Sequence, residues 1–306
     1  MNAHGLLIVD KPQGLTSHDI VSQARKLYGT RAVGHAGTLD PMATGVLLLL
    51  FGEATKLSSA LTSDRKRYVG TVAFGRATDS HDADGATTQE SEVPPSLLEG
   101  SRLELALEAE RQRTLQLPPA VSALKVGGRR AHALVRAGAT PVLAERAVTV
   151  HSLVLTERAS TQIAIEMVVS RGYYVRALAR DLGAALGVPA HLAALRRLAS
   201  GPFELGDAAP WPLAAPISLV SVVEAARRAL PSRVLTSDGD RRARLGQPLE
   251  ANSFETDAPD GAELTAWLSP SGELVALGKA TDAGELRVVR GFQPQLTSTS
   301  VTAKPL

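Results

Sequence analysis

A continuous apolar run, Val46 to Phe51, limits most strongly what this chain can fold into. Such a run is typical of a buried strand. The segment before it, Gly34 to Gly45, is built mainly from small residues and contains His35 and Asp40. Pro41 restricts Asp40 to extended backbone conformations, and the glycines allow another chain to approach closely. We therefore expect a stiff loop that displays the Asp40 carboxylate beside a core strand.

Length and composition set the class of protein. The chain has 306 residues, which favours roughly two domains. It contains no cysteine, which excludes disulfides, thiolate nucleophiles and metal sites with cysteine ligands. The first ten residues show no charged region followed by a long apolar stretch, and the longest apolar run is far shorter than the roughly 18 residues of a membrane span. We expect a soluble, cytoplasmic protein without a signal peptide.

The charges are unevenly distributed. Residues 1–232 carry 25 Lys/Arg and 21 Asp/Glu, whereas residues 233–306 carry 8 and 10. Cations cluster in four places: Arg65-Lys66-Arg67, Arg129-Arg130 with Arg136, Arg171 with Arg176 and Arg180, and Arg196-Arg197. Such clusters can bind phosphates. On charge alone, solvated helix faces are the better interpretation.

Hydrophobic periodicity predicts several elements. Short strands are expected at Gly5 to Asp10 and at Arg67 to Phe74, and Ser17 is expected to cap a helix. A hairpin is expected from Arg146 to Leu155 and from Gln162 to Ser170.

Further along the chain, Ser96 to Arg113 is predicted to be a helix, and Arg171 to Arg176 is predicted to enter another one. Leu192 to Leu198 is a short segment that mixes apolar and basic residues. A domain boundary is expected near Pro231, after which short strands form a small β module.

Four side chains are candidates for chemistry, and each has an ordinary alternative. Asp40 is a candidate nucleophile or general base, or a turn residue before Pro41. His35 is a loop stabiliser or a nucleobase contact. Tyr68 can stack on a base or pack in the core. Arg176 can keep a buried carboxylate ionised or form a surface salt bridge; taken singly, each residue favours the ordinary role.

Metal binding is not expected. The seven histidines are scattered and none has a typical ligand spacing with an acid. Asp79, Asp82 and Asp84 resemble part of a calcium loop, but no glutamate follows at the required spacing. A hydrogen-bonded turn is the better interpretation.

Four segments, in order, carry a resemblance to a known family. They are Gly34-His35-Ala36-Gly37-Thr38-Leu39-Asp40-Pro41; Lys66-Arg67-Tyr68 with Gly75 and the loop from Thr78 to Gly85; Gln116-Leu117-Pro118-Pro119 with Ser122 to Lys125 and Gly128 to Ala131; and Arg171-Gly172-Tyr173-Tyr174-Val175-Arg176 with Leu195-Arg196-Arg197. Together they resemble the bacterial TruB-type tRNA pseudouridine synthases over residues 5–291.

The resemblance implies an α+β pseudouridine synthase fold. Its central mixed or antiparallel sheet would be flanked by helices and by RNA-gripping insertions. Residues 1–231 would form the catalytic domain, with an RNA-clamping insertion at about 86–140. Residues 232–292 would form a β-rich PUA-like RNA-binding domain that contacts the acceptor-stem side of tRNA, and residues 293–306 would form a flexible tail.

The resemblance also implies an activity, the isomerisation of uridine-55 in the T loop of tRNA to pseudouridine. Asp40 would be the catalytic aspartate acting on a flipped-out base. Tyr68 would stack on that base and is a candidate for handling the C5 proton, and Arg176 would pair with Asp40. No atom is gained or lost in the reaction, so no redox cofactor is expected, and the chain gives no reason to prefer attack at C1′ over attack at C6.

Other residues would bind the substrate. His35 would fill the space that the flipped nucleotides leave in the T loop, Tyr174 and Leu195 would line the uracil pocket, and Lys11 would brace that pocket. The clamp would use Lys125, Arg129 and Arg130. A monomer without membrane contact is expected.

Two positions depart from the family pattern, as does the segment from Glu110 to Thr114, which lacks the usual glycine before Gln116; two alternatives stay open. Ala36 stands where threonine is usual, and His132 stands where tyrosine is usual. The first alternative is a non-catalytic RNA-binding or RNA-folding protein. The second keeps the chemistry but acts on another structured RNA.

Overall fold

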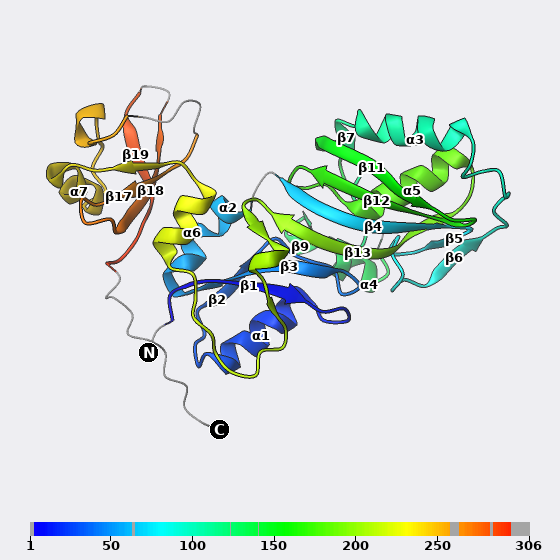
Figure 1. Ribbon diagram of the computed structural model, residues 1–306, viewed down its shortest axis with the longest axis horizontal. Coiled ribbons are helices and arrows are strands. Elements are labelled where there is room, and N and C mark those ends of the chain that lie inside the picture. Colours follow the sequence, from blue (N-terminus) through cyan, green and yellow to red (C-terminus); the bar gives the residue numbers. More distant parts are fainter. Residues whose placement is uncertain are drawn as a thin grey trace.

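A large mixed sheet dominates the computed structural model, which describes residues 3–62, 65–122, 124–139, 141–257, 263–281 and 284–294 (Figure 1). Its strand order is β11-β12-β4-β13-β3-β1-β15, with β14 paired to β13 and β2 paired to β3. These strands are β1 (Gly5–Lys11), β2 (Val33–Ala36), β3 (Thr44–Phe51), β4 (Lys66–Phe74), β11 (Val150–Arg158), β12 (Gln162–Val169), β13 (Ala190–Ser200), β14 (Phe203–Glu204) and β15 (Ala209–Pro210). The predicted strands at 5–10, 46–51, 67–74, 146–155 and 162–170 lie in or overlap this sheet or its neighbours.

Helices and short hairpins surround the sheet. The helices are α1 (Ser17–Leu27), α2 (Ser58–Leu61), α3 (Ser101–Arg111), α4 (Ala131–Arg136), α5 (Val175–Leu186), α6 (Val222–Ala229) and α7 (Ser237–Arg244), with 3-10 turns at Gly52–Leu57, Leu205–Asp207 and Ala251–Ser253. The small strand pairs are β5 (Arg76–Thr78) with β6 (Thr87–Glu90), β7 (Leu115–Gln116) with β10 (Arg146–Ala147), and β8 (Lys125–Val126) with β9 (Arg129–Arg130).

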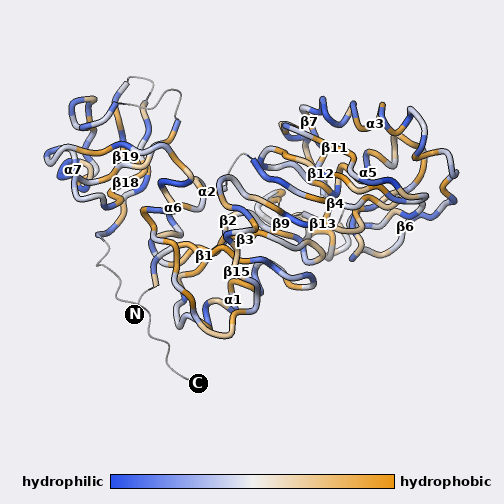
Figure 2. Tube along the Cα trace, viewed as in Figure 1, coloured by the Kyte–Doolittle hydropathy of each residue, from blue (hydrophilic) through white to orange (hydrophobic). Residues whose placement is uncertain are grey.

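The apolar run of β3 is continuous because both faces of this strand are covered. Leu47 and Leu49 belong to a core that also contains residues of α1, α3 and α5. Leu48 and Leu50 point to a second core, which contains α6 and residues of the C-terminal strands. Figure 2 shows the apolar residues gathered along β1 and the neighbouring strands, with hydrophilic residues on the outer turns of α3.

A four-stranded sheet follows in the C-terminal part. Its order is β16 (Ser232–Val234), β17 (Thr265–Leu268), β18 (Leu274–Ala280) and β19 (Leu286–Gly291). Trp267 is fully buried there, with its ring 5.2 Å from that of Phe254. The small β module is therefore present, and β16 begins beside the expected boundary; the division of the chain into domains stays a prediction.

Three local expectations need correction. The cap of α1 is Thr16, whose side chain accepts from the Asp19 amide, because the Ser17 side chain turns inward. The segment 34–45 is not all loop, since β2 includes His35. The segment 192–198, for which no element was predicted, is the middle of β13, and its buried positions include Arg197. α3 begins at Ser101 rather than at Ser96.

Two further observations concern the described residues. They include no helix with the length and apolar character needed to cross a membrane. All but the first two residues of the expected tail, 293–306, lie outside the described part of the chain.

Gly45 provides a test of how closely β3 and β13 approach. An added Cβ would lie 2.2 Å from the Arg197 carbonyl oxygen, and the backbone has φ +100°. We expect Gly45→Ala to lower the free energy of unfolding by about 3 kcal/mol or more. Gly29→Ala is the control, because Gly29 also has positive φ but a methyl group there meets nothing within 4 Å; it should cost about 1 kcal/mol. Urea denaturation measures both, and equal losses would contradict the role assigned to close approach.

Candidate active site

The loop that carries Asp40 connects β2 to β3 and is fixed on both sides of the carboxylate. Ser17 is buried, and its hydroxyl accepts from the Leu39 amide at 2.9 Å and donates to the Leu39 carbonyl at 3.0 Å. The Gly14 amide donates to the Pro41 carbonyl at 2.8 Å. These contacts hold the backbone at residues 39 and 41, so the position of Asp40 between them is restricted.

Lys11 adds a buried cation beneath this loop. Its ammonium group donates to the carbonyls of Pro12, Leu15 and Pro41 at 2.8, 2.6 and 3.3 Å. Burial lowers the pKa of Lys11 to about 8, and the nearby charge of Asp40 acts in the opposite direction. Lys11 therefore ties the turn after β1 to the residue that follows Asp40.

Arg176, in the first turn of α5, faces both oxygens of the Asp40 carboxylate. Its Nε lies 2.9 Å from Oδ2, and its Nη2 donates to Oδ1 at 3.2 Å. The same guanidinium donates to the carbonyls of Ser80 at 2.8 Å and Val121 at 3.0 Å. Its side chain is only 5 % exposed, so these acceptors replace water around the charge.

Asp82 is a second carboxylate beside Arg176, with Oδ2 3.5 Å from Nε. The Asp82 side chain is 6 % exposed, whereas that of Asp40 is 35 % exposed. Asp40 is therefore the one of the two that a substrate can reach. The other oxygen of Asp82 accepts from the Ser80 hydroxyl and the Asp84 amide, so the expectation of a hydrogen-bonded turn is confirmed.

Opposing effects set the protonation of Asp40. Burial within the surrounding protein raises its pKa, the Arg176 guanidinium lowers it, and the Asp82 carboxylate raises it; the result is a raised pKa. The ion pair with Arg176 is thus the main interaction that favours the ionised form of Asp40.

The register of the sheet aligns the remaining residues. Lys11 pairs with Gly45, Gly45 with Arg197, and Arg197 with Tyr68, so they form one row across β1, β3, β13 and β4. Adjacent strands lie about 4.8 Å apart, which puts Tyr68 two strands from Gly45. Tyr68 and Leu195 are buried and share a core with Leu39 and Met42, which flank Asp40 in the loop. The loop that carries the carboxylate therefore packs on an apolar core, and the buried side chains of this core are here called the apolar floor.

Tyr174 precedes α5 and is held through its backbone. Gln116, which is 1 % exposed, accepts from the Tyr174 amide at 2.8 Å and donates to the Tyr174 carbonyl at 3.2 Å. Burial raises the pKa of the Tyr174 hydroxyl, and the charges of Arg176 and Asp40 both act on it. Because its pKa is raised, the Tyr174 hydroxyl keeps its proton at neutral pH.

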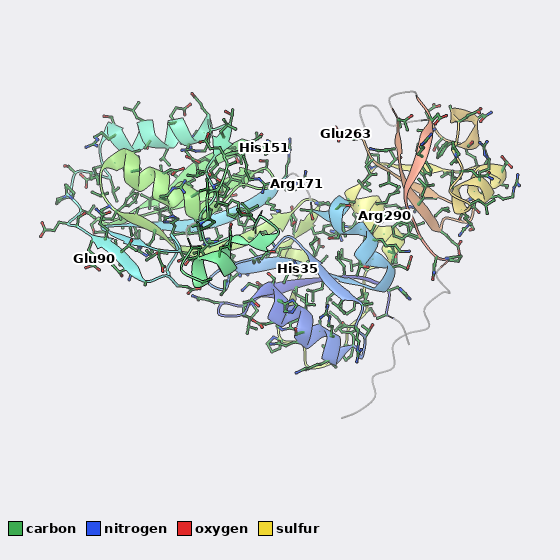
Figure 3. All side chains as sticks on the ribbon, turned by 180° about the vertical axis from the view of Figure 1, so that it is seen from behind. His35, Glu90, His151, Arg171, Glu263 and Arg290 are labelled. Atoms are coloured by element: carbon green, nitrogen blue, oxygen red, sulfur yellow. The ribbon has the colours of Figure 1, made fainter. Side chains whose placement is uncertain are left out.

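The remaining predicted residues lie on β2 or in the β8–β9 hairpin. His35 is half-buried on β2 opposite Leu49. In Figure 3 His35 and Arg171 lie near the middle of the view, and Arg290 lies on the C-terminal sheet. The backbones of Lys125, Arg129 and Arg130 form the β8–β9 hairpin, but their side chains, like that of His132, lie outside the described part.

Three residues that hold this site were not predicted to belong to it: Ser17, Gln116 and Asp82. Gln116 and Asp82 lie in segments that carry the family resemblance, which was the only signal for them. Nothing in the sequence indicated that the Ser17 side chain points inward, because an inward serine at the start of a helix has the same sequence pattern as a capping serine.

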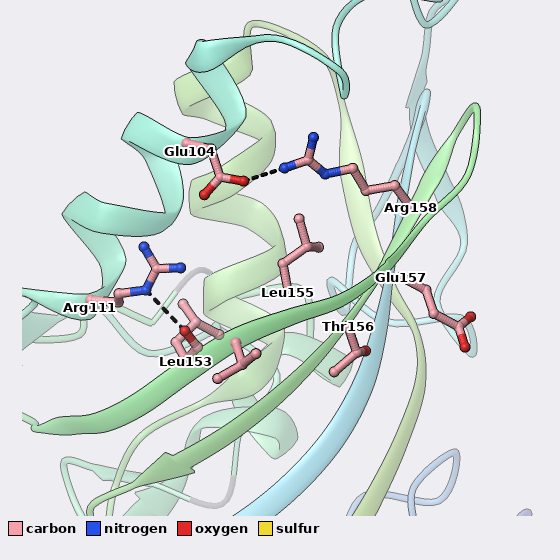
Figure 4. Close-up of a pocket in the computed structure, with 8 residues that line it drawn as sticks. Glu104, Arg111, Leu153, Leu155, Thr156, Glu157 and Arg158 are labelled. Carbon is pink, nitrogen blue, oxygen red and sulfur yellow. Dashed lines mark hydrogen bonds and ion pairs between the residues drawn. The ribbon is translucent and has the colours of Figure 1, made fainter.

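The structure also has a surface cavity away from Asp40, of about 420 Å³, between α3 and β11 (Figure 4). Arg111 donates to the Leu153 carbonyl there at 2.9 Å, and Arg158 pairs with Glu104. None of the residues predicted for the site lines it. Within the described ranges, no three or more His, Cys, Asp or Glu side chains are grouped so that they could hold a metal ion.

Comparisons with known proteins identify the family. The model of the TruB family pseudouridylate synthase N-terminal domain matches residues 25–175, and that of the tRNA pseudouridylate synthase B C-terminal domain matches residues 176–214. The chain belongs to the TruB family of pseudouridylate synthases. The expected family and the expected enzyme class, an isomerase, are confirmed.

Particular relatives cover nearly the whole chain. The tRNA pseudouridine synthase B of Arthrobacter sp. (strain FB24) is 42 % identical over 290 residues, which are 92 % of this chain and 93 % of the relative. That of Dinoroseobacter shibae is 41 % identical over 297 residues, 94 % and 95 % of the two chains.

Solved structures support the fold. A chain from a Cbf5-Nop10-Gar1 complex has a TM-score of 0.72 at 24 % identity and covers 95 % of this chain and 85 % of its own. A chain from an H/ACA RNP bound to a substrate RNA containing 2′-deoxyuridine has a TM-score of 0.69 at 23 % identity and covers 95 % of this chain and 86 % of its own. The α+β pseudouridine synthase fold is therefore confirmed.

The lowered pKa of Lys11 predicts how the free energy of unfolding changes with pH. Its pKa is about 8 in the folded protein, whereas an unperturbed lysine has a pKa of 10.5. Between these values the unfolded chain binds more protons, so this group makes the free energy of unfolding rise with pH. Relative to Lys11→Met, the wild type should gain on the order of 2 kcal/mol from pH 8 to pH 10.

Urea denaturation across that pH range measures this difference. Lys26→Met, at an exposed position near the end of α1, is the control for removing a lysine. A constant difference between the wild type and Lys11→Met would show that Lys11 does not titrate in this window.

Proposed function

We propose that the protein converts uridine-55 in the T loop of tRNA to pseudouridine, with Asp40 as the nucleophile that acts on a flipped-out base. The observation that supports this most directly is the partly exposed Asp40 carboxylate, which is held by the buried Arg176 and lies on a loop that packs on the apolar floor. Membership of the TruB family supports the reaction, and relatives named tRNA pseudouridine synthase B support tRNA as the substrate.

The reaction replaces one bond between the base and the ribose with another. The N1–C1′ glycosidic bond breaks, the uracil rotates, a C5–C1′ bond forms, the proton on C5 is lost and N1 gains a proton. No atom is gained or lost overall, so the reaction is redox-neutral. A carboxylate can act as the nucleophile at either C1′ or C6. The apolar floor suits a detached uracil, which must be held while it turns.

Each neighbouring side chain has a proposed role in these reaction steps. Tyr68 stacks on the base and is the candidate for accepting the C5 proton. Arg176 keeps Asp40 ionised. Tyr174 and Leu195 line the uracil pocket, and Lys11 braces the loop that carries Asp40.

RNA contacts are proposed for three regions. His35 occupies the space that the flipped nucleotides leave in the T loop. Lys125, Arg129 and Arg130 form part of a clamp within residues 86–140 of a catalytic domain that spans residues 1–231. Residues 232–292 form a PUA-like domain that contacts the acceptor-stem side. Flipping costs a few kcal/mol, which phosphate contacts offset, so binding should weaken with salt.

Two alternatives differ from this proposal. A non-catalytic RNA-binding or RNA-folding protein would need no ionised carboxylate, and the arrangement of Asp40 and Arg176 argues against it. The same chemistry on another structured RNA is distinguished by comparing activity on an isolated T stem-loop with activity on other hairpins.

Replacement of the nucleophile gives the decisive test. We expect Asp40→Asn to lower the rate by roughly 10³-fold or more, because an amide cannot supply the nucleophile. Tritium release from tRNA that contains 5-³H-uridine measures the rate, and filter binding measures tRNA affinity, which should stay within about threefold. Sequencing of the modified position checks that it is uridine-55. Retained isomerisation by Asp40→Asn, or no tritium release by the wild type, would disprove the proposal.

The pair of Arg176 with Asp40 predicts a pH effect. Arg176→Lys keeps one positive charge but loses the two-point contact, so it should raise the pKa of Asp40 further. Because the ionised form is required, the acid limb of the single-turnover rate should move up by roughly one pH unit. Arg102→Lys is the matched control, since Arg102 donates to the Leu186 carbonyl at the other end of α5. Identical acid limbs in Arg176→Lys and the wild type would refute the assigned role.

A further inference from the structure

A segment that contributes no proposed catalytic group runs beside the start of α5. Residues 110–122, here called the strap, lead from the end of α3 to Val121, whose carbonyl accepts from Arg176 at 3.0 Å. The chain then continues into the β8–β9 hairpin and α4. The strap is therefore covalently continuous with the hairpin and α4, and it reaches the guanidinium that faces Asp40 through a hydrogen bond.

A buried carboxylate fixes the beginning of the strap. Glu110 is 1 % exposed, and its Oε1 accepts from the Tyr173 hydroxyl at 2.6 Å while its Oε2 accepts from Arg113 Nε at 2.6 Å. Burial and the neighbouring Glu110 charge raise the pKa of Tyr173 well above its usual value, so its hydroxyl keeps its proton and donates. Arg113 reaches on to Asp181 of α5 at 3.4 Å.

The middle of the strap holds the residue that precedes α5. Gln116 makes paired hydrogen bonds with the backbone of Tyr174, two residues before Arg176. Arg180, one turn further along α5, donates to the Leu117 carbonyl at 3.0 Å. The strap and the first turns of α5 are thus joined from Tyr173 to Asp181.

We propose that Glu110, Tyr173 and Gln116 are positioning residues for the isomerisation. The Tyr173–Glu110 contact fixes the strap against α5, and the strap in turn aims the Arg176 guanidinium at Asp40 through Val121 and Tyr174. This role rests on the proposed function of Asp40 and Arg176. A buried, charge-assisted hydrogen bond suits it, because loss of either partner leaves the other unsatisfied and lets the segment shift.

The test removes one hydroxyl group. Tyr173→Phe should lower the single-turnover rate at saturating tRNA about tenfold, leave the tRNA dissociation constant within about twofold, and move the acid limb of the rate to higher pH. The matched control is Tyr28→Phe, because the Tyr28 hydroxyl also makes two hydrogen bonds, with Ile217, far along the chain from the strap. Tyr28→Phe should lower the unfolding midpoint without changing the rate or its pH profile.

A second variant covers the case in which Tyr173→Phe does not fold. Gln116→Glu keeps the acceptor for the Tyr174 amide but loses the donor to its carbonyl, and it should lower the rate at unchanged tRNA affinity. Unchanged rates and pH profiles in both variants would overturn the inference, as would losses in Tyr28→Phe that equal those in Tyr173→Phe. Inactivity of the wild type would instead count against the proposed function itself, so the two failures are distinguishable.

Discussion

The ion pair between Arg176 and Asp40 is the interaction on which the rest of the site depends. It joins residues 136 positions apart in the sequence, and the same guanidinium also bonds the carbonyls of Ser80 and Val121. A buried guanidinium without partners would be strongly destabilising, so the acceptors that these loops offer stabilise the fold. One charge thereby fixes the relative positions of three irregular segments.

Buried cations hold this region more generally. Lys11 and Arg197 are both fully buried, and both donate to backbone carbonyls of loops or strand ends. Arg197 bonds the carbonyls of Val46 and Gly37 at 2.7 and 2.9 Å. Irregular loops expose many carbonyls that no helix or sheet satisfies, and cations satisfy several of them at once. The charge of Lys11 also lowers the pKa of Asp40, by less than the charge of Arg176 does.

Sequence patterns predicted the parts of the structure that depend on local rules. The apolar run of β3 and the helix after Arg171 follow from hydrophobic periodicity, and the small residues around Asp40 indicated a constrained loop. The pairing of Asp40 with Arg176 came only from the family resemblance. Ser17 was misassigned and β13 was not predicted, because an inward serine and a strand that buries Arg197 are defined by contacts with distant segments, which no local pattern encodes.

Substrate binding should make the placement of Arg176 more important than it is in the free protein. Burial already raises the pKa of Asp40, and a uracil over its exposed side would displace the water that remains. The ionised form then depends almost entirely on the guanidinium, since Asp82 acts in the opposite direction. A small shift of Arg176 would therefore change the protonation of Asp40 more in the complex than without RNA. This is why contacts that never reach the base, such as those of Ser17 and Gln116 with the backbone, belong to the physical basis of the chemistry.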